Sequence, residues 1–460
     1  MTETDRYQLV ILGAGSAGVR AGRLAAQRGL SVAVVEQAPV GGTCVNVGCI
    51  PKKLYSYAAH HGDAFEEARG YGWHTATEPV FDWDTLKANR RVEITRLNRI
   101  YESVLAGAGA TLLRGQGRLV DARHVEVEGR VVEAERIVVA TGGRPLGLPV
   151  SGTDLAVSSD AMFDLPAFPK RLVVVGGGYI ACEFASIFSG LGAEVTLLHR
   201  GERLLRGFDA DVQRFVADEM GKKGIAIRLG TRIECLRREQ GAIRIDLSEA
   251  AGGDATLQAD TVLAATGRAP NTRGLGLEEA GVRLGATGAV VVDDAYRSSV
   301  DGIFAIGDVI DRVQLTPVAL AEAMVLVDAL TGRGARTLDY ERVPTAVFTH
   351  PNVGTVGLTE AAARERFGDV RIFRSDFKPL RHTLSGSTER TLMKLVVEAA
   401  TDRVVGLHMV GSDAGEIVQG FAVAMAAGVT KAQVDSTLGI HPTAAEEFVT
   451  MREPVAARVA

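Results

Sequence analysis

The chain has 460 residues, which suggests about three domains at the usual ~150 residues each. Its 51 basic and 56 acidic residues leave a net charge of −5 without a long basic run, which argues against a nucleic-acid partner or an anionic membrane surface. The start, MTETDRYQLVILGAG, lacks a basic segment followed by an apolar one, and no run of ~18 apolar residues occurs. We therefore expect a cytoplasmic protein that does not span a membrane.

The first recognisable unit, residues 7–36, has the order strand, glycine turn, helix, strand: YQLVIL, GAGSAG, VRAGRLAAQRG and SVAVVE. Gly13, Gly15 and Gly18 fit the spacing G-x-G-x-x-G, which provides a tight turn, close approach to a pyrophosphate and close helix packing. Glu36 ends the second strand, where a carboxylate accepts hydrogen bonds from a ribose 2′-hydroxyl and repels a 2′-phosphate. The pattern predicts a site for the adenosine of FAD or NAD.

Two closely spaced cysteines follow in GGTCVNVGCIPKK. In a reducing compartment such a pair, Cys44 and Cys49, is typical of metal binding or of redox chemistry. A zinc site needs two further ligands, and the chain has no second close cysteine pair, so redox exchange is the better interpretation. We expect no metal site, and we expect Cys182 and Cys235, which have no partner in sequence, to be inert.

A second strand, glycine turn, helix and strand occupy residues 171–200: RLVVV, GGGYIA, CEFASIFSGLG and EVTLLHR. The small residues are now Gly176, Gly178 and Ala181, and the position that corresponds to Glu36 is His199, followed by Arg200 and, one loop later, Arg206. Two guanidinium groups can bind a 2′-phosphate, which predicts NADP rather than NAD. The alternative is that both arginines are solvated surface charges.

Each of these units ends in a similar phrase, IVVATGGRP at 137–145 and VLAATGRAP at 262–270, which marks a domain boundary. The segment 301–320 is another strand and turn before a helix, and it carries Asp308 in a Gly-Asp turn. After about residue 340, strand-like runs such as TLMKLVVEA are followed by amphipathic helical sequence, so we expect an α+β module there. The predicted fold is α/β, with two Rossmann-like domains and a C-terminal α+β domain.

Other polar residues have two interpretations. Lys52 and Lys53 follow the cysteine pair and Glu183 lies in the second nucleotide helix, where a lysine held by a carboxylate can stabilise charge on a flavin, or where all three can be solvated. His441 and Glu446, in GIHPTAAEEF, can supply a proton at neutral pH, although a lone histidine is more often structural.

Seven motifs together resemble the pyridine nucleotide–disulfide oxidoreductase family, and most closely its glutathione reductases of bacteria and plants. They cover essentially the whole chain: GAGSAG, GGTCVNVGCIPKK, GGGYIACEFASIF, HRGERLLRGFD, AIGD with LTPVAL, FTHPNVGTVGLTE and GIHPTAAEEFVTMRE. The resemblance implies an FAD-binding domain (1–142), an NADP-binding domain (143–270), a central segment that completes the FAD site (271–340) and a C-terminal interface domain (341–460) of a homodimer.

The resemblance also implies roles for individual residues. Tyr179 gates the nicotinamide pocket, Lys52 with Glu183 lies near the reacting flavin nitrogen, and Asp308 binds the ribityl chain. Cys49 faces the flavin, Cys44 attacks glutathione disulfide, and His441 of the partner subunit, oriented by Glu446, moves the proton. Further cofactor-binding positions are Ser16, Gly42, Thr43, Gly117, Thr141, Gly142, Thr316, Ile180, Gly267 and Arg268.

Substrate choice in this family depends on charge. Arg20 and Arg23 on the first helix favour an anionic disulfide, and Ser16 and Tyr101 match positions that contact glutathione. The expected activity is NADPH-dependent reduction of glutathione disulfide, which maintains the reduced thiol pool. A reductase of another small disulfide, similar to dihydrolipoamide dehydrogenase or trypanothione reductase, and a redox-sensing flavoprotein are the alternatives. Met324 departs from the arginine found in animal and some bacterial glutathione reductases.

Overall fold

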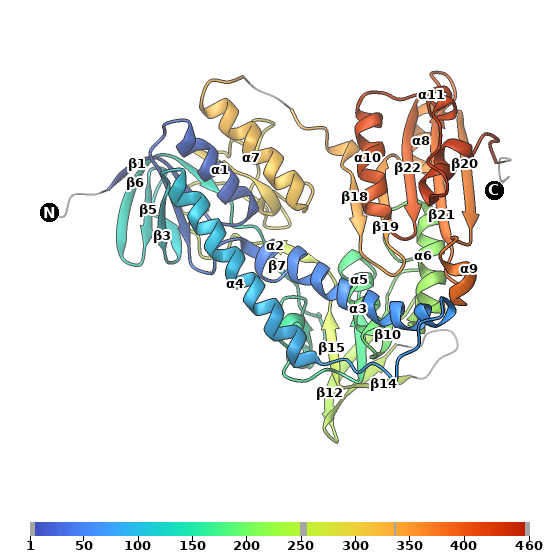
Figure 1. The fold of residues 1–460 in the computed structure, drawn as a ribbon. Coiled ribbons are helices and arrows are strands. Elements are labelled where there is room, and N and C mark those ends of the chain that lie inside the picture. The colour runs from blue at the N-terminus through green and yellow to red at the C-terminus, as the bar shows by residue number, and fades with distance from the viewer. Residues whose placement is uncertain (1–4, 249–254, 335–336, 456–460) are drawn as a thin grey trace.

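The computed structural model describes residues 5–248, 255–334 and 337–455. Figure 1 shows three regions: a first α/β unit on the left, a second unit at the lower centre, and a C-terminal sheet with its helices at the upper right. The predicted fold class is confirmed by this architecture.

The first unit is built on a sheet with the order β3-β2-β1-β6-β5-β4, in which β17 also pairs with β6. The last four residues of strand β1, Leu9 to Leu12, are apolar and buried, as a central parallel strand requires. The elements are β1 (Arg6–Leu12), α1 (Ser16–Gln27), β2 (Val32–Glu36), α2 (Gly42–Asn46), α3 (Cys49–Gly70), α4 (Trp83–Gly107), β3 (Thr111–Arg114), β4 (Gly117–Leu119), β5 (His124–Val127), β6 (Arg130–Val139) and β7 (Gly143–Pro145).

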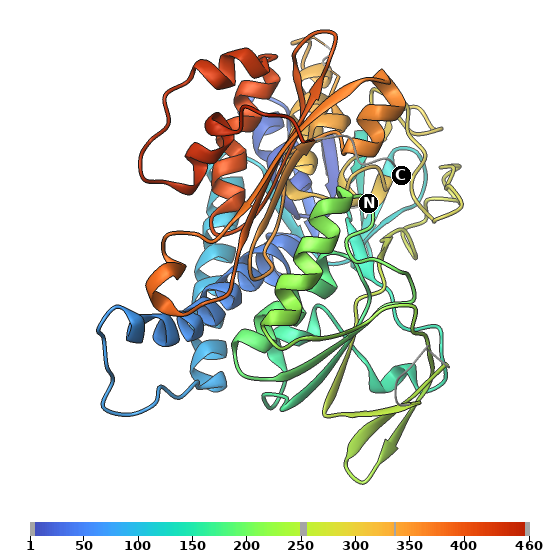
Figure 2. The same cartoon turned by 90° about the vertical axis from the view of Figure 1, so that its right-hand side faces the viewer.

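The second unit repeats this plan with a five-stranded parallel sheet, order β11-β10-β9-β15-β8. A three-stranded antiparallel sheet, β12-β13-β14, projects from its lower end (Figures 1 and 2). Its elements are β8 (Val157–Ser158), β9 (Arg171–Val175), α5 (Tyr179–Gly190), β10 (Glu194–Leu198), α6 (Ala210–Lys222), β11 (Ala226–Arg228), β12 (Ile233–Glu239), β13 (Ala242–Leu247), β14 (Thr256–Ala259), β15 (Thr261–Ala264) and β16 (Arg268–Pro270).

The two similar closing phrases of the sequence lie against each other. Strand β7 pairs antiparallel with β16, with Arg144 opposite Ala269. The chain therefore leaves the first unit and returns to it through one two-stranded ribbon. After the return, β17 (Ile303–Ala305) joins β6, and α7 (Thr316–Leu330) packs on α1.

The C-terminal region is an antiparallel sheet of order β18-β19-β22-β21-β20, covered by helices. Its elements are β18 (Thr345–Val347), β19 (Val353–Gly357), α8 (Glu360–Phe367), β20 (Val370–Phe377), α9 (His382–Ser385), β21 (Thr391–Glu398), β22 (Val404–Val410), α10 (Ala414–Ala426), α11 (Lys431–Ser436) and α12 (Glu447–Thr450).

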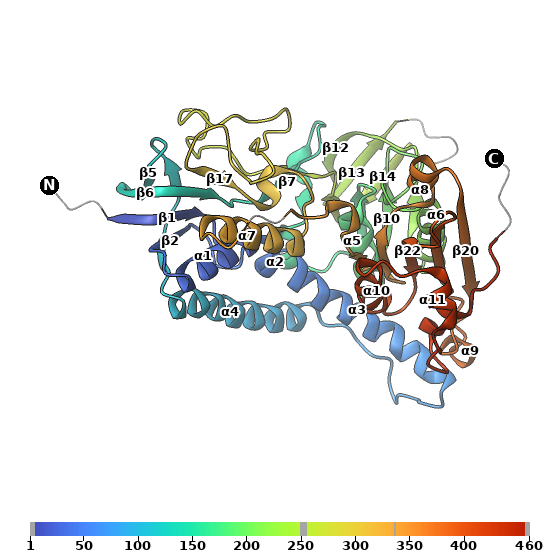
Figure 3. The same ribbon diagram turned by 90° about the horizontal axis from the view of Figure 1, so that it is seen from above.

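The hydrophobic cores do not follow the chain order. One core combines the first unit with residues of the segment 275–327. Another combines Tyr55 of α3 and Trp83 of α4 with the second unit and with Val353 and Leu392 of the C-terminal sheet. Helix α3 therefore links all three regions, and Figure 3 shows it running from the first unit toward the C-terminal helices. Among the described residues, no helix is long and apolar enough to cross a membrane.

Candidate active site

The two cysteines meet at a break between helices. Cys44 lies in α2 and Cys49 is the first residue of α3. Gly48 makes the break possible, because a Cβ there would lie 2.7 Å from the Thr43 carbonyl oxygen. Both residues are free thiols, and Cys44 is hydrogen-bonded to Cys49.

This contact separates the acidities of the two thiols. The hydrogen bond donated by Cys44 lowers the pKa of Cys49 to about 6, and the Thr316 hydroxyl, 3.6 Å from Cys49 Sγ, and the Lys52 ammonium act in the same direction. The start of helix α3 also favours negative charge at this position. The same hydrogen bond, together with burial, raises the pKa of Cys44. These interactions favour the thiolate at Cys49 and the protonated thiol at Cys44.

Next to the pair lies a buried ion pair between Lys52 of α3 and Glu183 of α5. Lys52 Nζ is 2.6 Å from Glu183 Oε1, and the Glu183 side chain is 3% exposed. The backbone NH of Phe348 donates to the same oxygen at 2.9 Å, and its ring lies under the Lys52 and Lys53 ammonium groups at 4.2 and 3.8 Å. Sequence reasoning missed Phe348, although it begins the motif FTHPNVGTVGLTE.

A second set of polar groups lies around Tyr179, the first residue of α5. Asp308 lies in a 3-10 turn (Gly307–Ile310), where burial raises the pKa of its carboxyl group. Within the described part of the chain, no other residue donates a hydrogen bond to this side chain. Burial likewise raises the pKa of Tyr179 to about 12, with Glu183 adding to the rise and Arg268 opposing it. Arg268 donates to the Gly143 carbonyl at 2.6 Å and lies 3.6 Å from Asp160.

The glycine turn of the first unit is packed as the motif predicts. Gly13 has φ +100°, and a Cβ on Gly18 would lie 1.9 Å from the Gly13 carbonyl oxygen. Gly15 faces Gly42: a Cβ built on Gly15 would lie 3.8 Å from the Gly42 Cα, which is an ordinary contact distance. Glu36 Oε2 accepts from the Ala14 NH at 2.7 Å, and its Oε1 accepts from the Ala38 NH at 2.8 Å.

These observations fit a bound FAD. The open glycine turn can accept a pyrophosphate, and the remaining lone pairs of Glu36 can accept from a ribose. Asp308 is a mostly buried carboxyl group without a partner among the described residues, so it can accept from hydroxyl groups of the same ligand.

The glycine turn of the second unit has the opposite charge. Gly176 has φ +147°, and Ala181 packs against it, with its Cβ 3.3 Å from a Cβ built on Gly176. The His199 ring fills the space beside Gly177, where a Cβ would lie 2.5 Å from its Cγ. Burial lowers the pKa of His199, and Arg200 and Arg206 lower it further. Both arginines are exposed, and neither forms a hydrogen bond or ion pair with another described residue.

The other predicted cofactor positions lie around these two turns. Thr141 Oγ1 donates to the Asn271 carbonyl at 2.7 Å, and Thr43 Oγ1 accepts from Arg268 at 3.5 Å. Gly142 and Gly267 have φ +69° and +143°. Gly117 instead packs inside the sheet, where a Cβ would lie 2.7 Å from Leu12 and 3.0 Å from Val35. Ile180, in the first turn of α5, is half-buried.

The predicted substrate-binding residues lie on helices α1 and α4. Ser16, at the start of α1, hydrogen-bonds to Cys44. Burial raises the pKa of Tyr101 on α4; the Cys44 thiol adds to the rise and Arg20 opposes it. Arg23 is exposed on α1, and Met324 is 36% exposed on α7.

His441 and Glu446 form a hydrogen-bonded pair near the C-terminus, in which His441 is largely exposed and Glu446 is half-buried. Both Glu446 carboxylate oxygens lie 3.1 Å from His441 Nδ1, and the His441 side chain is 81% exposed. Across the described residues, no hydrogen bond or ion pair joins His441 to either cysteine.

The sequence places the thiol pair between two glycine turns of the kind that binds dinucleotides. This combination is typical of enzymes that pass electrons from a nucleotide to a disulfide. The comparisons agree: a family model described as pyridine nucleotide-disulphide oxidoreductase matches residues 7–323, and one for the dimerisation domain of these proteins matches residues 343–452. The chain belongs to the pyridine nucleotide-disulphide oxidoreductase family.

Curated relatives cover nearly the whole chain. It is 48% identical to the glutathione reductase of Burkholderia cepacia over 446 residues, which are 97% of this chain and 98% of the relative. It is 46% identical to the chloroplastic/mitochondrial glutathione reductase of Pisum sativum, over 97% of this chain and 82% of the relative. The glutathione reductase of a Nostoc species is 42% identical over 98% of this chain and 100% of the relative.

Proposed function

We propose that this protein reduces glutathione disulfide to two molecules of glutathione, with NADPH as electron donor, FAD as bound cofactor and Cys44–Cys49 as the redox-active disulfide, and so maintains the reduced thiol pool. The observation that carries the proposal is the Cys44–Cys49 pair, in which the pKa of one thiol is lowered and that of the other is raised. In the sequence the pair lies between the glycine turn that Glu36 accompanies and the glycine turn that Arg200 and Arg206 accompany. The activity named for the relatives supports it.

The two turns divide the nucleotides between them. Gly13, Gly15, Gly18 and Glu36 hold the adenosine and pyrophosphate of FAD, and Asp308 accepts from its ribityl hydroxyls. Gly176, Gly178 and Ala181 receive NADPH, with Arg200 and Arg206 on its 2′-phosphate. Bound FAD supplies a two-electron carrier between the nicotinamide and the sulfur pair. Tyr179 would gate the nicotinamide pocket, and Glu183 orients Lys52.

The sulfur steps follow from the acidities of the two thiols. Cys44, which needs a base because its pKa is raised, attacks one sulfur of glutathione disulfide, so that a Cys44–glutathione disulfide forms and one glutathione thiolate leaves. The Cys49 thiolate then attacks the Cys44 sulfur, which releases the second glutathione and forms the Cys44–Cys49 disulfide.

The base is His441 of a second subunit in a homodimer. In its own chain His441 is largely exposed and fixed by Glu446, so the pair is available to an adjoining surface. His441 takes the Cys44 proton and returns it to the leaving thiolate. The match to a dimerisation domain over residues 343–452 supports this arrangement.

The same proposal covers substrate choice and organisation. Arg20 on α1, with Ser16 and Tyr101, provides positive charge for the carboxylates of glutathione, and Arg23 lies further along the same helix. We assign residues 1–142 to the FAD-binding domain, 143–270 to the NADP-binding domain, 271–340 to the central segment that completes the FAD site, and 341–460 to the C-terminal interface domain. The proposed compartment is the cytoplasm.

The test replaces Cys44 with Ser and measures two half-reactions. We expect the C44S variant to lose turnover of glutathione disulfide, while NADPH still reduces the flavin, because both dinucleotide turns remain intact. The matched control is Cys235→Ser, which changes a cysteine that donates to Asp246 at 3.0 Å in β13. Disulfide turnover by the C44S variant at the wild-type rate would contradict the proposal.

A further inference from the structure

A buried charge cluster joins the second unit to the C-terminal sheet. The ammonium group of Lys394, in β21, lies 2.9 Å from Asp209, 2.7 Å from Asp211 and 2.8 Å from Glu360. The Lys394 and Asp209 side chains are each 1% exposed. Breaking a buried pair of this kind leaves an uncompensated charge and is strongly destabilising, so the cluster holds its elements in one arrangement.

Asp209 is also the N-cap of α6. Its Oδ1 accepts from the Asp211 NH at 3.0 Å, and its Oδ2 accepts from the Glu360 NH at 3.0 Å, at the start of α8. One carboxylate therefore caps α6 and ties it to two elements of the C-terminal region. Figure 2 shows α6 lying against the C-terminal sheet.

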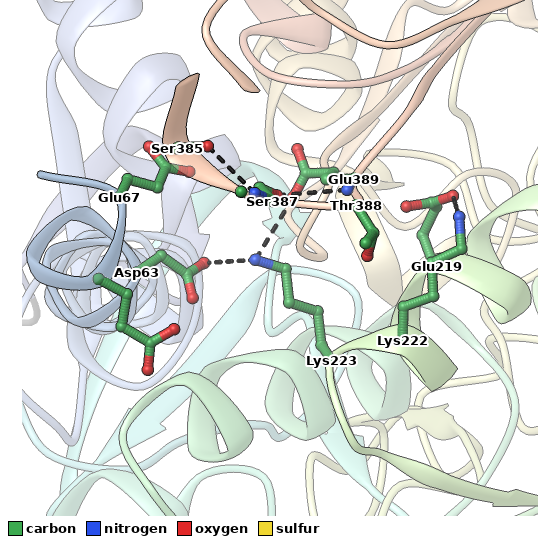
Figure 4. A pocket seen from close by; sticks show the side chains of 11 residues that line it. Asp63, Glu67, Glu219, Lys222, Lys223, Ser385, Ser387, Thr388 and Glu389 are labelled. Atoms are coloured by element: carbon green, nitrogen blue, oxygen red, sulfur yellow. Dashed lines mark hydrogen bonds and ion pairs between the residues drawn. The ribbon is translucent and has the colours of Figure 1, made fainter. Parts of the chain in front are cut away.

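The far end of α6 is tied down as well. Lys223, just after the helix, lies 3.0 Å from Asp63 of α3 and 3.5 Å from Glu389 (Figure 4). Glu219, near the end of α6, accepts from the Arg390 NH at 3.2 Å. The helix is thus fixed at both ends to residues beside or within β21. It cannot shift along the sheet without breaking ion pairs at both ends.

The segment that α6 fixes is the arm 199–209, which carries Arg200 and Arg206. The Leu205 NH donates to the Gly177 carbonyl of the glycine turn at 2.6 Å. Gln213, in the first turn of α6, donates to the carbonyl groups of Leu205 and Phe208 at 3.0 and 3.1 Å. The arm therefore runs from the glycine turn to the capped start of α6 and is held at both places.

We propose that Lys394, with Asp209, positions the arm 199–209 and so sets how tightly Arg200 and Arg206 bind the 2′-phosphate of the coenzyme. The inference rests on the proposed role of these two arginines. Lys394 touches no ligand; it acts through Asp209, the α6 cap and the backbone of the arm. The C-terminal region thereby takes part in coenzyme selection by the second unit.

The test measures KM and kcat of the holoenzyme with NADPH and with NADH. For Lys394→Met we expect a KM for NADPH raised by about tenfold, with the KM for NADH and both kcat values close to wild type, because only a contact to the phosphate is misplaced. The matched control is Lys431→Met, another buried lysine of the C-terminal region, which pairs with Asp435 and lies 4.1 Å from the Phe373 ring centroid. It should leave the NADPH-to-NADH ratio unchanged.

A second variant separates positioning from long-range charge and keeps the test valid if Lys394→Met does not fold. Glu360→Gln removes a negative charge from a side chain that is 30% exposed. If the buried cluster positions the arm 199–209, NADPH should bind more weakly in both variants. If the cluster instead acts only through its charge on the coenzyme phosphate, removing a negative charge in E360Q should make NADPH bind more tightly. Tighter NADPH binding in E360Q, or equal changes for both coenzymes, would overturn the inference. An Arg200→Gln, Arg206→Gln variant with unchanged coenzyme preference would instead refute the role of the arginines.

Discussion

The two glycine turns of this protein have the same backbone plan and opposite charge. In the first, Glu36 ends the second strand and its carboxylate accepts from the Ala14 NH of the turn itself. In the second, the equivalent position is the His199 ring, packed beside Gly177, and Arg200 and Arg206 are the charges that face solvent. The comparison teaches that two turns of the same backbone plan can carry opposite charge at one strand end, and we propose that this strand end decides which dinucleotide each turn binds.

The largest effect should come from removing the charge of the second turn. In an Arg200→Gln, Arg206→Gln variant we expect the KM for NADPH to rise by about 10²- to 10⁴-fold, because each charge-assisted bond to a phosphate contributes about 1.5–3 kcal/mol. The KM for NADH should barely change. Steady-state kinetics with both coenzymes check this, and an equal loss with both would show that the arginines do not bind the phosphate.

A smaller effect should distinguish the third small residue of each turn. Gly18→Ala places a Cβ 1.9 Å from the Gly13 carbonyl oxygen, so the backbone must move, at a cost of about 1–3 kcal/mol or more. Ala181→Gly removes one buried methyl group from the start of α5 and should cost about 1–2 kcal/mol.

Denaturant unfolding of both variants, together with their FAD content, measures this difference. We expect G18A to lose FAD and stability, and A181G to keep FAD. Equal losses would mean that the two turns are packed alike, despite their different small residues.

The smallest change concerns the sulfur pair between the turns. Because the pKa of Cys49 is lowered to about 6, its thiolate should appear as pH rises through about 6 and disappear below it. Cys44→Ala removes the main hydrogen bond to that thiolate, so the midpoint should move upward. Thiolate ultraviolet absorbance of the reduced protein, against a Cys49→Ser control, checks both statements. A midpoint at the ordinary pKa of a thiol in both proteins would contradict them.

Much of the fold could be predicted because local patterns determine it. The apolar run before Gly13 and the similar run before Gly176 each became a central parallel strand followed by a helix. The short spacing of Cys44 and Cys49 kept the two thiols together at the break between α2 and α3. Such features depend on residues that are neighbours in sequence, so a single sequence contains them.

Contacts between distant segments could not be predicted in this way. The pairing of β7 with β16 brings together two phrases that the sequence only shows to be similar. Phe348 reaches Glu183 because the C-terminal sheet packs on α5 and α3. Lys394 is a charged residue inside an apolar strand pattern, and only the structure shows the three carboxylates around it.

The most direct test of the account is the rate of NADPH oxidation by the purified protein with glutathione disulfide, beside the same assay with NADH and, separately, with lipoamide. We predict fast turnover confined to NADPH with glutathione disulfide, because in the proposed function Arg200 and Arg206 select the coenzyme and Arg20 favours the anionic disulfide. A flavin that NADPH reduces and glutathione disulfide does not reoxidise would contradict the proposed substrate. Equal rates with NADH and NADPH would contradict the proposal that the second glycine turn selects NADPH.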